Sequence, residues 1–483
     1  MAPPCVRLPR EALISMPSPR CLSYPAPDIA PLAWLRRRGD QRAHSLCGVF
    51  HTTAGPEPMD AIANLVTGPL QSWDAVVCPS QAIRRTVERV TEQWLGYLAS
   101  LGASLRPTAQ LPVIPLGVDA DAFADSDARR NLQARWRERI GAAPDDPVVL
   151  FVGRLSYHAK ANPFPLFVAL EAAAQGIGGR THLVLSGWFA SDTIEAQFRA
   201  AAALCRAVRV TFVDGRTEEG RAGPWAAADV FASLVDNIQE TFSLTPLEAM
   251  AAGLPVVATD WNGYRETVRH CVDGFLVPTV APPAGAGLAL SLRLRAAIDS
   301  YGRYIGSAAQ SVAVDIGAAR EAFAAVLADA GLRRRMGAAG RARARETFDW
   351  RVIVAAYQAL WVELAARRHG DAERAPRAPG AAADPLRDDP YTAFAHYPSA
   401  TLGPETRLAR VPDATTDRVA SVTPMVDYTG YLLPDAGVLA AALATLERAP
   451  ATAGALIEAM PCPADTAYRG LAWLIKIGCV RII

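Results

Sequence analysis

The sequence predicts an α/β protein with two doubly wound lobes, followed by a small helical module. Short apolar runs alternate with helical stretches through most of the chain, which is typical of parallel sheets with helical crossovers. The runs of the second lobe are short and apolar rather than alternating, as expected of parallel strands covered on both faces. A stretch rich in Gly, Ala, Pro and Asp at 369–390 reads as a linker to the module. With 483 residues the chain has room for about three domains.

The first lobe is predicted over residues 1–119. Its strands and helices are inferred from short β-type runs that alternate with helical stretches. We expect strands at 20–24, 45–50, 74–78 and 111–114, and helices at 29–38 and 81–101.

The second lobe is predicted over residues 120–368. Periodic helix continues to its end, and we expect the helix around Trp350–Trp361 to return to the first lobe. The predicted strands of this lobe lie at 148–152, 182–185, 208–212, 230–232, 256–258 and 274–277.

The predicted C-terminal module covers residues 391–483 and resembles a winged helix, with helices at 435–449, 452–460 and 464–478 and a closing strand at 479–483. From 435 onward its acidic and basic residues balance. DNA binding normally needs a basic face, so packing or self-association is the favoured role and nucleic acid is not expected.

The whole chain has a net charge of +1, which excludes a general attraction to nucleic acid or anionic membranes. Peripheral membrane contact would need a local cluster. The eight cysteines are scattered without metal-ligand spacing, which favours free thiols in a reducing compartment. No apolar run reaches about 18 residues and the first 20 residues do not read as a signal peptide, so a cytoplasmic protein is expected.

The segment from Glu240 to Asp260 is the most informative stretch. Thr245 is placed to cap a helix, with Pro246 at its first position and Glu248 completing a capping box. The N–H groups of Thr241–Leu244 would lie beside the positive end of that helix, an arrangement that binds phosphate. Glu240, just outside, suits sugar hydroxyls. The competing interpretation is that Glu248 only closes the cap.

A second element, Phe151–Lys160, combines a strand end, a glycine turn and two cations. Arg154 and Lys160 would emerge at the carboxyl end of a parallel strand, where α/β sheets bind ligands. Both can bind phosphate oxygens, although two solvated loop charges are the commoner outcome. Only two lysines, Lys160 and Lys476, occur among 49 basic residues, so the position of Lys160 is informative.

The order of these motifs resembles family 4 of the retaining GT-B glycosyltransferases, over about residues 40–365. The resemblance rests on Ile114-Pro-Leu-Gly-Val-Asp119, Phe151-Val-Gly-Arg154 with Lys160, Glu240-x7-Glu248, Ala252-Gly-Leu-Pro-Val-Val-Ala-Thr259, Asp273-Gly-Phe-Leu-Val277 and Phe348-Asp-Trp350.

This resemblance implies two Rossmann-like lobes facing a cleft, and it implies roles for individual residues. Glu240 would contact the transferred sugar, and His51 of Phe50-His-Thr52 would face the sugar from the other lobe, as the catalytic pair. The remaining donor-binding residues would be Arg154 and Lys160 on the diphosphate, Thr241, Phe242, Ser243 and Leu244 around the phosphate, and Glu248 on the ribose.

Other positions are less specific. Arg84 and Arg85 resemble acceptor-side basic residues, with solvated helix charges as the equal alternative. Thr241 and Ser243 stand where the family often has glycine, which narrows backbone freedom.

The resemblance further implies transfer with retention by front-face attack, in which the leaving phosphate accepts the acceptor proton. No cofactor or metal is expected, and Asp119-Ala-Asp121, despite its likeness to a metal-binding Asp-x-Asp, is interpreted as a turn. The donor would be a nucleotide-diphosphate sugar and the acceptor a glycan, lipid or small molecule, as in polysaccharide biosynthesis.

The first lobe is shorter than the family pattern and lacks an evident glycine-rich loop in residues 1–40. Two alternatives to the glycosyltransferase therefore stay open. One is a sugar-nucleotide epimerase or phosphorylase of the same fold, and the other is a catalytically weak nucleotide-sugar-binding protein. A DNA regulator is a further, less favoured possibility.

Overall fold

The computed structural model describes residues 21–177, 180–412, 414 and 428–483. The chain forms two compact units, Met1–Asp384 and Pro385–Ile483. The first unit contains both predicted lobes, and its parallel sheets confirm the predicted α/β class.

The first lobe is a three-stranded parallel sheet in the order β1-β2-β3. Cys21 pairs with Ser45, and Cys47 pairs with Ala75. The elements of this lobe are β1 (Cys21–Ser23), α2 (Ala30–Arg36), β2 (Ser45–Val49), α3 (Pro56–Thr67), β3 (Ala75–Val77) and α4 (Gln81–Ser100). Residue 20 of the first predicted strand lies outside the described residues.

The prediction of a fourth strand at 111–114 was wrong. This stretch pairs with β3 only at isolated parallel bridges, which join Ala75 to Gln110 and Cys78 to Val113. Backbone hydrogen bonds run from Gln110 N to Asp74 O and from Ile114 N to Cys78 O. Pro112, between them, has no N–H to donate, so the ladder is interrupted.

The second lobe is a six-stranded sheet in the order β6-β5-β4-β7-β8-β9, and every pairing in it is parallel. All six strands were predicted, with ends shifted by at most two residues. They are β4 (Val148–Val152), β5 (Thr181–Gly187), β6 (Val208–Asp214), β7 (Val230–Ser233), β8 (Val256–Thr259) and β9 (Gly274–Val277).

Helices and two short strands complete this lobe. A two-stranded ladder of β10 and β11 lies apart from the main sheet. The elements are η1 (Asp121–Phe123), α5 (Asp127–Ile140), α6 (Phe164–Ala174), α7 (Asp192–Ala202), α8 (Glu218–Ala227), α9 (Thr245–Ala252), α10 (Tyr264–Thr267), β10 (Thr279–Val280), α11 (Leu288–Arg295), α12 (Tyr301–Ala309), β11 (Ala313–Val314), α13 (Ile316–Ala328), α14 (Ala330–Arg343) and η2 (Ala344–Phe348).

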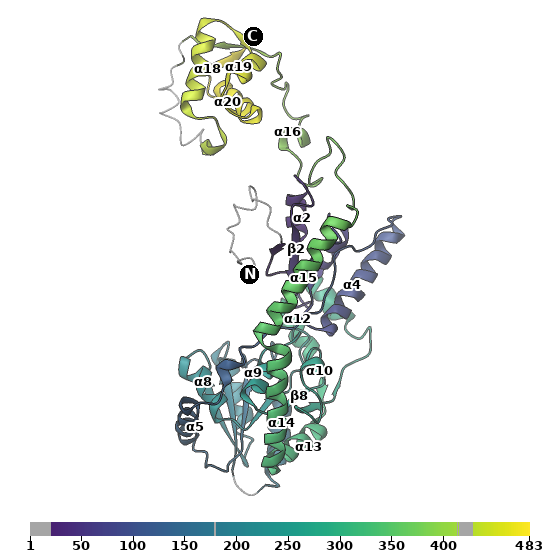
Figure 1. The fold of residues 1–483 in the computed structure, drawn as a ribbon, viewed down its shortest axis with the longest axis vertical. Coiled ribbons are helices and arrows are strands. Elements are labelled where there is room, and N and C mark those ends of the chain that lie inside the picture. Colours follow the sequence, from purple (N-terminus) through teal and green to yellow (C-terminus); the bar gives the residue numbers. More distant parts are fainter. Residues whose placement is uncertain (1–20, 178–179, 413, 415–427) are drawn as a thin grey trace. The chain divides into compact units, whose positions relative to one another are not determined.

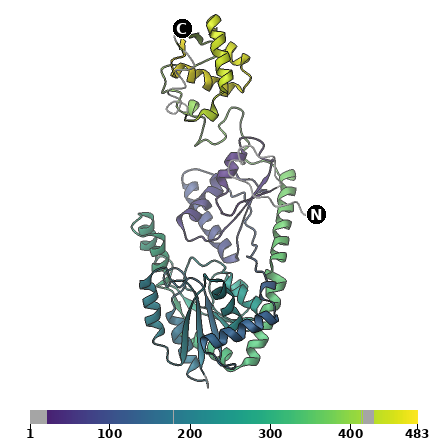
Figure 2. The same cartoon turned by 90° about the vertical axis from the view of Figure 1, so that its left-hand side faces the viewer.

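The last helix of the unit, α15 (Trp350–Gly370), returns along the first lobe, as predicted (Figures 1 and 2). Its buried residues Ile353, Leu360 and Leu364 form one apolar cluster with β2 and β3. Where the chain crosses between the lobes, Val118 and Phe348 are joined by a backbone hydrogen bond of 2.8 Å. Gly117 packs there against the Trp350 ring, so a Cβ atom would lie 2.5 Å from it.

The first part of the predicted linker is held on the first lobe. Gln71 Nε2 donates to the carbonyl oxygen of Arg374 at 3.0 Å, and Arg37 donates to that of Ala383 at 2.9 Å. Side-chain and backbone hydrogen bonds thus order a stretch whose composition alone indicated flexibility.

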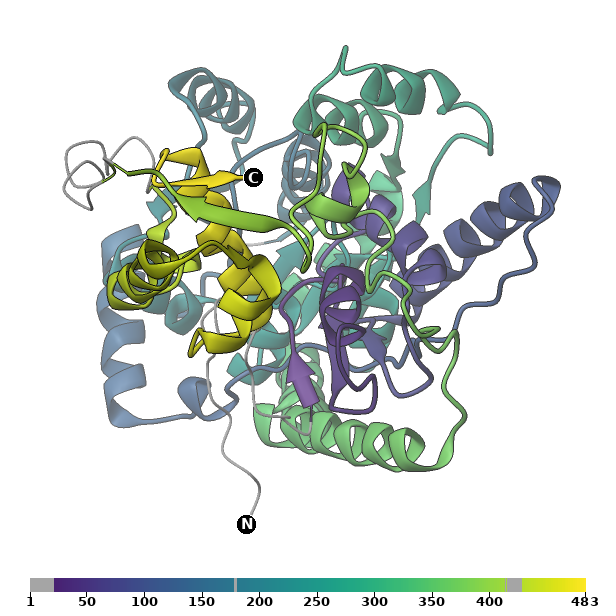
Figure 3. The ribbon, with the colours of Figure 1, turned by 90° about the horizontal axis from the view of Figure 1, so that it is seen from above.

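In the described residues, the second unit combines short helices with a three-stranded antiparallel sheet in the order β13-β12-β14 (Figure 3). Its last three helices and closing strand fall where they were predicted. The elements are α16 (Pro390–Ala393), β12 (Arg407–Arg410), η3 (Gly430–Leu432), α18 (Ala436–Arg448), β13 (Ala451–Thr452), α19 (Ala453–Ala459), α20 (Ala464–Lys476) and β14 (Val480–Ile482).

Across the described ranges, the helices are all too short or too polar to cross a membrane.

Candidate donor site

The order of strands in the second lobe places two loops side by side. Strands β4 and β7 are neighbours in the middle of the sheet. The strand order continues from β4 through β5 to β6 on one side, and from β7 through β8 to β9 on the other. In such sheets ligands bind at the carboxyl ends of the strands where the order reverses. The loops that follow β4 and β7 carry Arg154, Lys160 and Glu240.

The loop after β4 turns tightly against the next strand. Gly187 ends β5, and a Cβ atom there would lie 1.8 Å from the carbonyl oxygen of Gly153. Arg154 follows and is exposed, with one hydrogen bond of 3.2 Å to the carbonyl oxygen of Ala159. Among the described residues no carboxylate forms an ion pair with Arg154, so its guanidinium can bind an anion.

The loop after β7 is anchored on the loop after β4. Asn237 Nδ2 donates to the carbonyl oxygen of His158 at 2.9 Å, and Gln239 Nε2 donates to that of Ala159 at 3.2 Å. Trp261 Nε1 donates to the carbonyl oxygen of Asn237 at 3.1 Å. These bonds fix the two loops relative to each other.

Lys160 and Glu240 meet across the two loops, as Lys160 Nζ donates to Glu240 Oε2. Burial by itself lowers the pKa of Lys160, but the charges of Tyr264 and Glu240 outweigh it, so the pKa lies above its usual value. The ammonium is therefore charged at neutral pH. A cavity of about 250 Å³ opens here, lined by Val152, Gly153, Arg154, Ala159, Lys160, Asn237, Gln239, Glu240 and Thr245.

The backbone after Glu240 presents unbonded N–H groups. Within the described part of the chain, the N–H groups of Phe242, Ser243 and Leu244 donate no hydrogen bond. Such groups at a helix start can receive an anion. Ser243 has φ +62°, a left-handed conformation that favours glycine, and its hydroxyl lies 3.5 Å from Lys160 Nζ.

The predicted capping box was wrong. Helix α9 begins at Thr245, so Leu244 occupies the cap position and no side chain caps the helix. The Thr245 hydroxyl instead lies 3.2 Å from that of Ser243, because the left-handed turn brings the two together. Glu248 is thereby left without a side-chain partner among the described residues, and burial raises its pKa.

His51 lies opposite this segment on the first lobe. Its side chain is exposed, and its carbonyl oxygen accepts a hydrogen bond of 2.8 Å from the Thr241 hydroxyl. Ser80 also donates to the carbonyl oxygen of Thr241, at 3.1 Å. The Phe50-His-Thr52 turn thus meets the donor loop through the hydrogen bond from the Thr241 side chain to the His51 carbonyl oxygen, and the predicted role of the imidazole stays a prediction.

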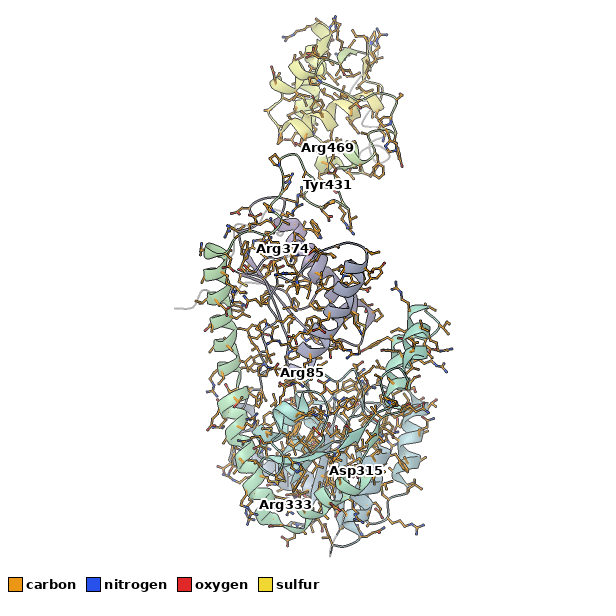
Figure 4. All side chains as sticks on the ribbon, turned by 90° about the vertical axis from the view of Figure 1, so that its right-hand side faces the viewer. Arg85, Asp315, Arg333, Arg374, Tyr431 and Arg469 are labelled. Atoms are coloured by element: carbon orange, nitrogen blue, oxygen red, sulfur yellow. The ribbon has the colours of Figure 1, made fainter. Side chains whose placement is uncertain are left out.

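The predicted acceptor-side arginines lie on α4, outside the cavity. Arg84 pairs with Glu88 on the same helix at 2.8 Å, and both side chains are about 43% exposed. Figure 4 shows Arg85 at the end of the first lobe nearest the second. The start of α4 is itself occupied, because Glu266 accepts from the N–H groups of Gln81 and Ala82 at 2.9 and 3.2 Å.

Asp119-Ala-Asp121 is a turn, as interpreted from the sequence. Asp119 Oδ1 accepts from the backbone N–H of Asp121 at 3.1 Å. Asp121 forms ion pairs with Arg345 and Arg351 at 3.6 and 3.2 Å. Both carboxylates are thus engaged at the connection between the lobes.

Sequence reasoning missed several residues that build the site. Asn237 and Gln239 hold the loops together, Asn262 Nδ2 donates to the carbonyl oxygen of Glu240, and Tyr264 is fully buried with its hydroxyl 2.9 Å from Ser233. A polar run directly after the apolar strand β7 was the available signal for the first two. Nothing local identified Asn262 or Tyr264, which come from a segment about 20 residues later.

Comparisons with known proteins agree with this geometry. Residues 146–292 match the family model described as glycosyl transferases group 1. A D-inositol 3-phosphate glycosyltransferase from Xylanimonas cellulosilytica is 31% identical over 331 residues, which are 67% of this chain and 66% of that protein. Another, from Mycobacteroides abscessus, is 35% identical over 35% of this chain and 36% of its own length.

The chain thus spans less than two thirds of the length of these relatives. A solved structure, sucrose-phosphate synthase from Thermosynechococcus elongatus, is similar with 21% identity over 76% of this chain and 82% of that chain, at a TM-score of 0.46. The matched residues 146–292 contain β4 to β9 and both loops of the site, so the second lobe of this chain matches the glycosyl transferases of group 1.

Proposed function

We propose that this protein is a metal-independent, retaining glycosyltransferase that moves a sugar from a nucleotide-diphosphate donor to an acceptor. The observation that carries the proposal is the cavity at the reversal of strand order, where Arg154, Lys160 and Glu240 converge. Two cations suit a diphosphate, and a carboxylate suits sugar hydroxyls. The match of residues 146–292 to the glycosyl transferases of group 1 supports the same chemistry.

The pairing of Lys160 with Glu240 sets the order in which the diphosphate and the sugar hydroxyls are bound. A diphosphate that binds Lys160 replaces Glu240 as its partner, and the carboxylate is then free to accept from sugar hydroxyls. The unbonded N–H groups of Phe242–Leu244 would meet the phosphate, and Glu248 would bind the ribose. Each group of the sugar donor therefore faces a protein group that either makes no other hydrogen bond or can release the one it makes.

In the proposed reaction, the bond between the sugar C1 and the leaving phosphate oxygen breaks while the acceptor oxygen bonds to C1 on the same face. The acceptor proton passes to the leaving phosphate. Arg154, Lys160 and the helix start stabilise the charge that develops on the diphosphate. This chain would contribute charge stabilisation and positioning, and no side-chain base is required.

The test is a thermal-shift screen with UDP, GDP and ADP sugars, followed by transfer assays. The relatives' name makes inositol 3-phosphate a first acceptor to assay. We expect Glu240→Ala to lower transfer by about 100-fold or more, with Glu218→Ala, on the distant α8, as the matched control. Donor binding without turnover in either form would favour a nucleotide-sugar-binding protein, and hydrolysis or epimerisation without acceptor would favour the other enzyme classes.

A further inference from the structure

A helical arm, residues 281–312, interrupts the second lobe between β10 and β11. Its two ends meet because Thr279 pairs with Val314 and Val280 pairs with Ala313. The arm contains α11 and α12, and it projects from the lobe (Figures 2 and 4). It is thus a closed excursion, which leaves the second lobe and returns to it at one point.

The two helices of the arm differ in how much they bury. Helix α12 buries Ile305 and Ala309. Its Gly306 lies so close to the loop after β4 that a Cβ atom would be 2.8 Å from the Cβ of His158. Helix α11 packs against α12 but buries none of its own residues. The arm is therefore anchored on the second lobe through α12, while α11 keeps most of its surface exposed.

The exposed surface of α11 is apolar. Leu288 and Leu292, one helical turn apart, are 63% and 59% exposed, and Ile298 in the turn after the helix is 62% exposed. The thirteen residues 280–292 carry no ionisable side chain, although 20% of the chain is charged. A single exposed leucine is ordinary, but neighbouring ones within an uncharged segment mark a binding surface.

The charges that border this surface are positive. The arm contains three arginines, Arg293, Arg295 and Arg303, and one carboxylate, Asp299, which gives it a net charge of +2. Asp299 is buried, pairs with Arg293 at 2.7 Å and lies 3.7 Å from Arg303, so only guanidinium charge is exposed on the arm. Arg295 follows Leu288 by seven residues, which puts it on the same face of α11 as the two leucines. Within the described ranges, no carboxylate forms an ion pair with Arg295.

We propose that the exposed face of α11 is a docking surface for a membrane that contains anionic lipids. Leu288 and Leu292 enter the boundary of the acyl chains, and Arg295 pairs with lipid phosphates. With eight residues, α11 can lie on a membrane surface but is too short to cross one. The net charge of the whole chain is only +1, so the attraction depends on this local combination. The surface is separate from the donor cavity, and the inference stands without the proposed function.

A second copy of the chain is the competing occupant, and the charges argue against it. In a two-fold contact the same face of both copies meets, so Arg295 would approach Arg295. The one carboxylate of the arm, Asp299, is buried and already paired. Residues 280–298 also contain none of the aromatic side chains in which protein interfaces are enriched. A lipid surface supplies the negative charge and needs no shaped partner.

The test is co-sedimentation of the whole chain with vesicles of phosphatidylcholine alone and of equal parts phosphatidylcholine and phosphatidylglycerol. We expect the wild type to bind the mixed vesicles more tightly, and high salt to weaken this binding. Leu288→Ser combined with Leu292→Ser should lower binding about 30-fold or more. Arg295→Ala should lower it about fivefold. Leu204→Ser is the matched control, since Leu204 is 68% exposed after α7, and it should bind like the wild type.

Two further measurements decide what covers α11. The variants should keep the wild-type melting temperature, because the replaced side chains are exposed, and mixed vesicles should slow hydrogen exchange over residues 281–298. No binding by the wild type, equal binding by the double variant and the control, or protection confined to another segment would each overturn the inference. A dimer in sedimentation velocity that the double variant abolishes, without vesicle binding, would assign the face to a second copy and overturn it as well.

Discussion

The two lobes of the first unit are stabilised by different interactions. The second lobe has a six-stranded parallel sheet with a continuous apolar core, and the first has three short strands. The smaller lobe encloses an ion pair, Arg36–Asp74 at 2.6 Å, with both side chains fully buried. It also shares an apolar cluster with α15. A small sheet buries less apolar surface, so it depends more on specific polar contacts and on its neighbour.

Asp74 offers the largest test of this difference. It accepts from Arg36 and from the backbone N–H groups of Leu46 and Gln71 at 2.9 and 2.8 Å. Asp74→Ala leaves a buried guanidinium without a counter-charge, and we expect it to lower the free energy of unfolding by about 3–5 kcal/mol. Urea denaturation measures this.

The matched control is Glu195→Ala, which removes one partner of an exposed pair with Arg199 in the second lobe. Its expected cost is below about 1 kcal/mol. Similar losses for the two variants would contradict the dependence of the first lobe on its enclosed pair.

In the second lobe, Asp236 is expected to lower the free energy of unfolding as the pH rises. Burial raises its pKa to about 7, and its Oδ1 has no partner among the described residues. The folded protein binds this proton more tightly than the unfolded chain does. The contribution of Asp236 to the free energy of unfolding is therefore fully present below about pH 4 and is lost as the pH rises through about 7. The loss is on the order of 4 kcal/mol.

Asp236→Asn should flatten this decline, which urea titrations at pH 5 and pH 8 measure. Asp192→Asn, at the exposed start of α7, serves as the control and should keep the wild-type slope. An unchanged pH dependence in Asp236→Asn would assign the decline to other groups.

The contact between the lobes can be weakened at Glu266. Its carboxylate receives the first two N–H groups of α4 and carries charge opposite to that of the helix end. We expect Glu266→Ala to cost about 1 kcal/mol in urea unfolding and to increase the radius of gyration in X-ray scattering. Glu88→Ala, in the middle of α4, should change neither. A scattering curve that matches wild type would mean that other contacts alone hold the lobes together.

A change of similar size but opposite sign is expected at the strained turn of the donor loop. Ser243→Gly should raise the free energy of unfolding by about 1 kcal/mol, because glycine adopts φ +62° without strain. Ser243→Ala removes the same hydroxyl but keeps the strain, so it should not stabilise the protein. A gain in both variants would point to the hydroxyl rather than the backbone.

Much of the second lobe could be predicted from the sequence. Most of its six strands are short and mainly apolar, as buried parallel strands usually are, whereas the edge strand β6 also carries Arg209 and Asp214. The cations after β4 and the carboxylate after β7 were also identifiable, since the ends of parallel strands share one edge. In the first lobe the same reasoning failed at 111–114, where one missing N–H at Pro112 outweighs the apolar pattern.

The capping box shows a different limit. Thr245, Pro246 and Glu248 fit a local rule for a helix start, yet Leu244 is the cap residue. The backbone of Ser243 turns left-handed just before the helix, and its hydroxyl contacts Lys160 of the other loop. Local propensity cannot include contacts that exist only after folding.

By itself, the sequence determined the α/β class, the strands of the donor lobe and the residues Arg154, Lys160 and Glu240 at its edge. Those follow from short-range patterns of burial and charge. Only the tertiary structure decided that Lys160 and Glu240 contact each other, and that the Glu266 carboxylate accepts from the first N–H groups of α4. Such pairs lie about 80 to 185 residues apart, and packing of whole elements, rather than any local preference, brings them together.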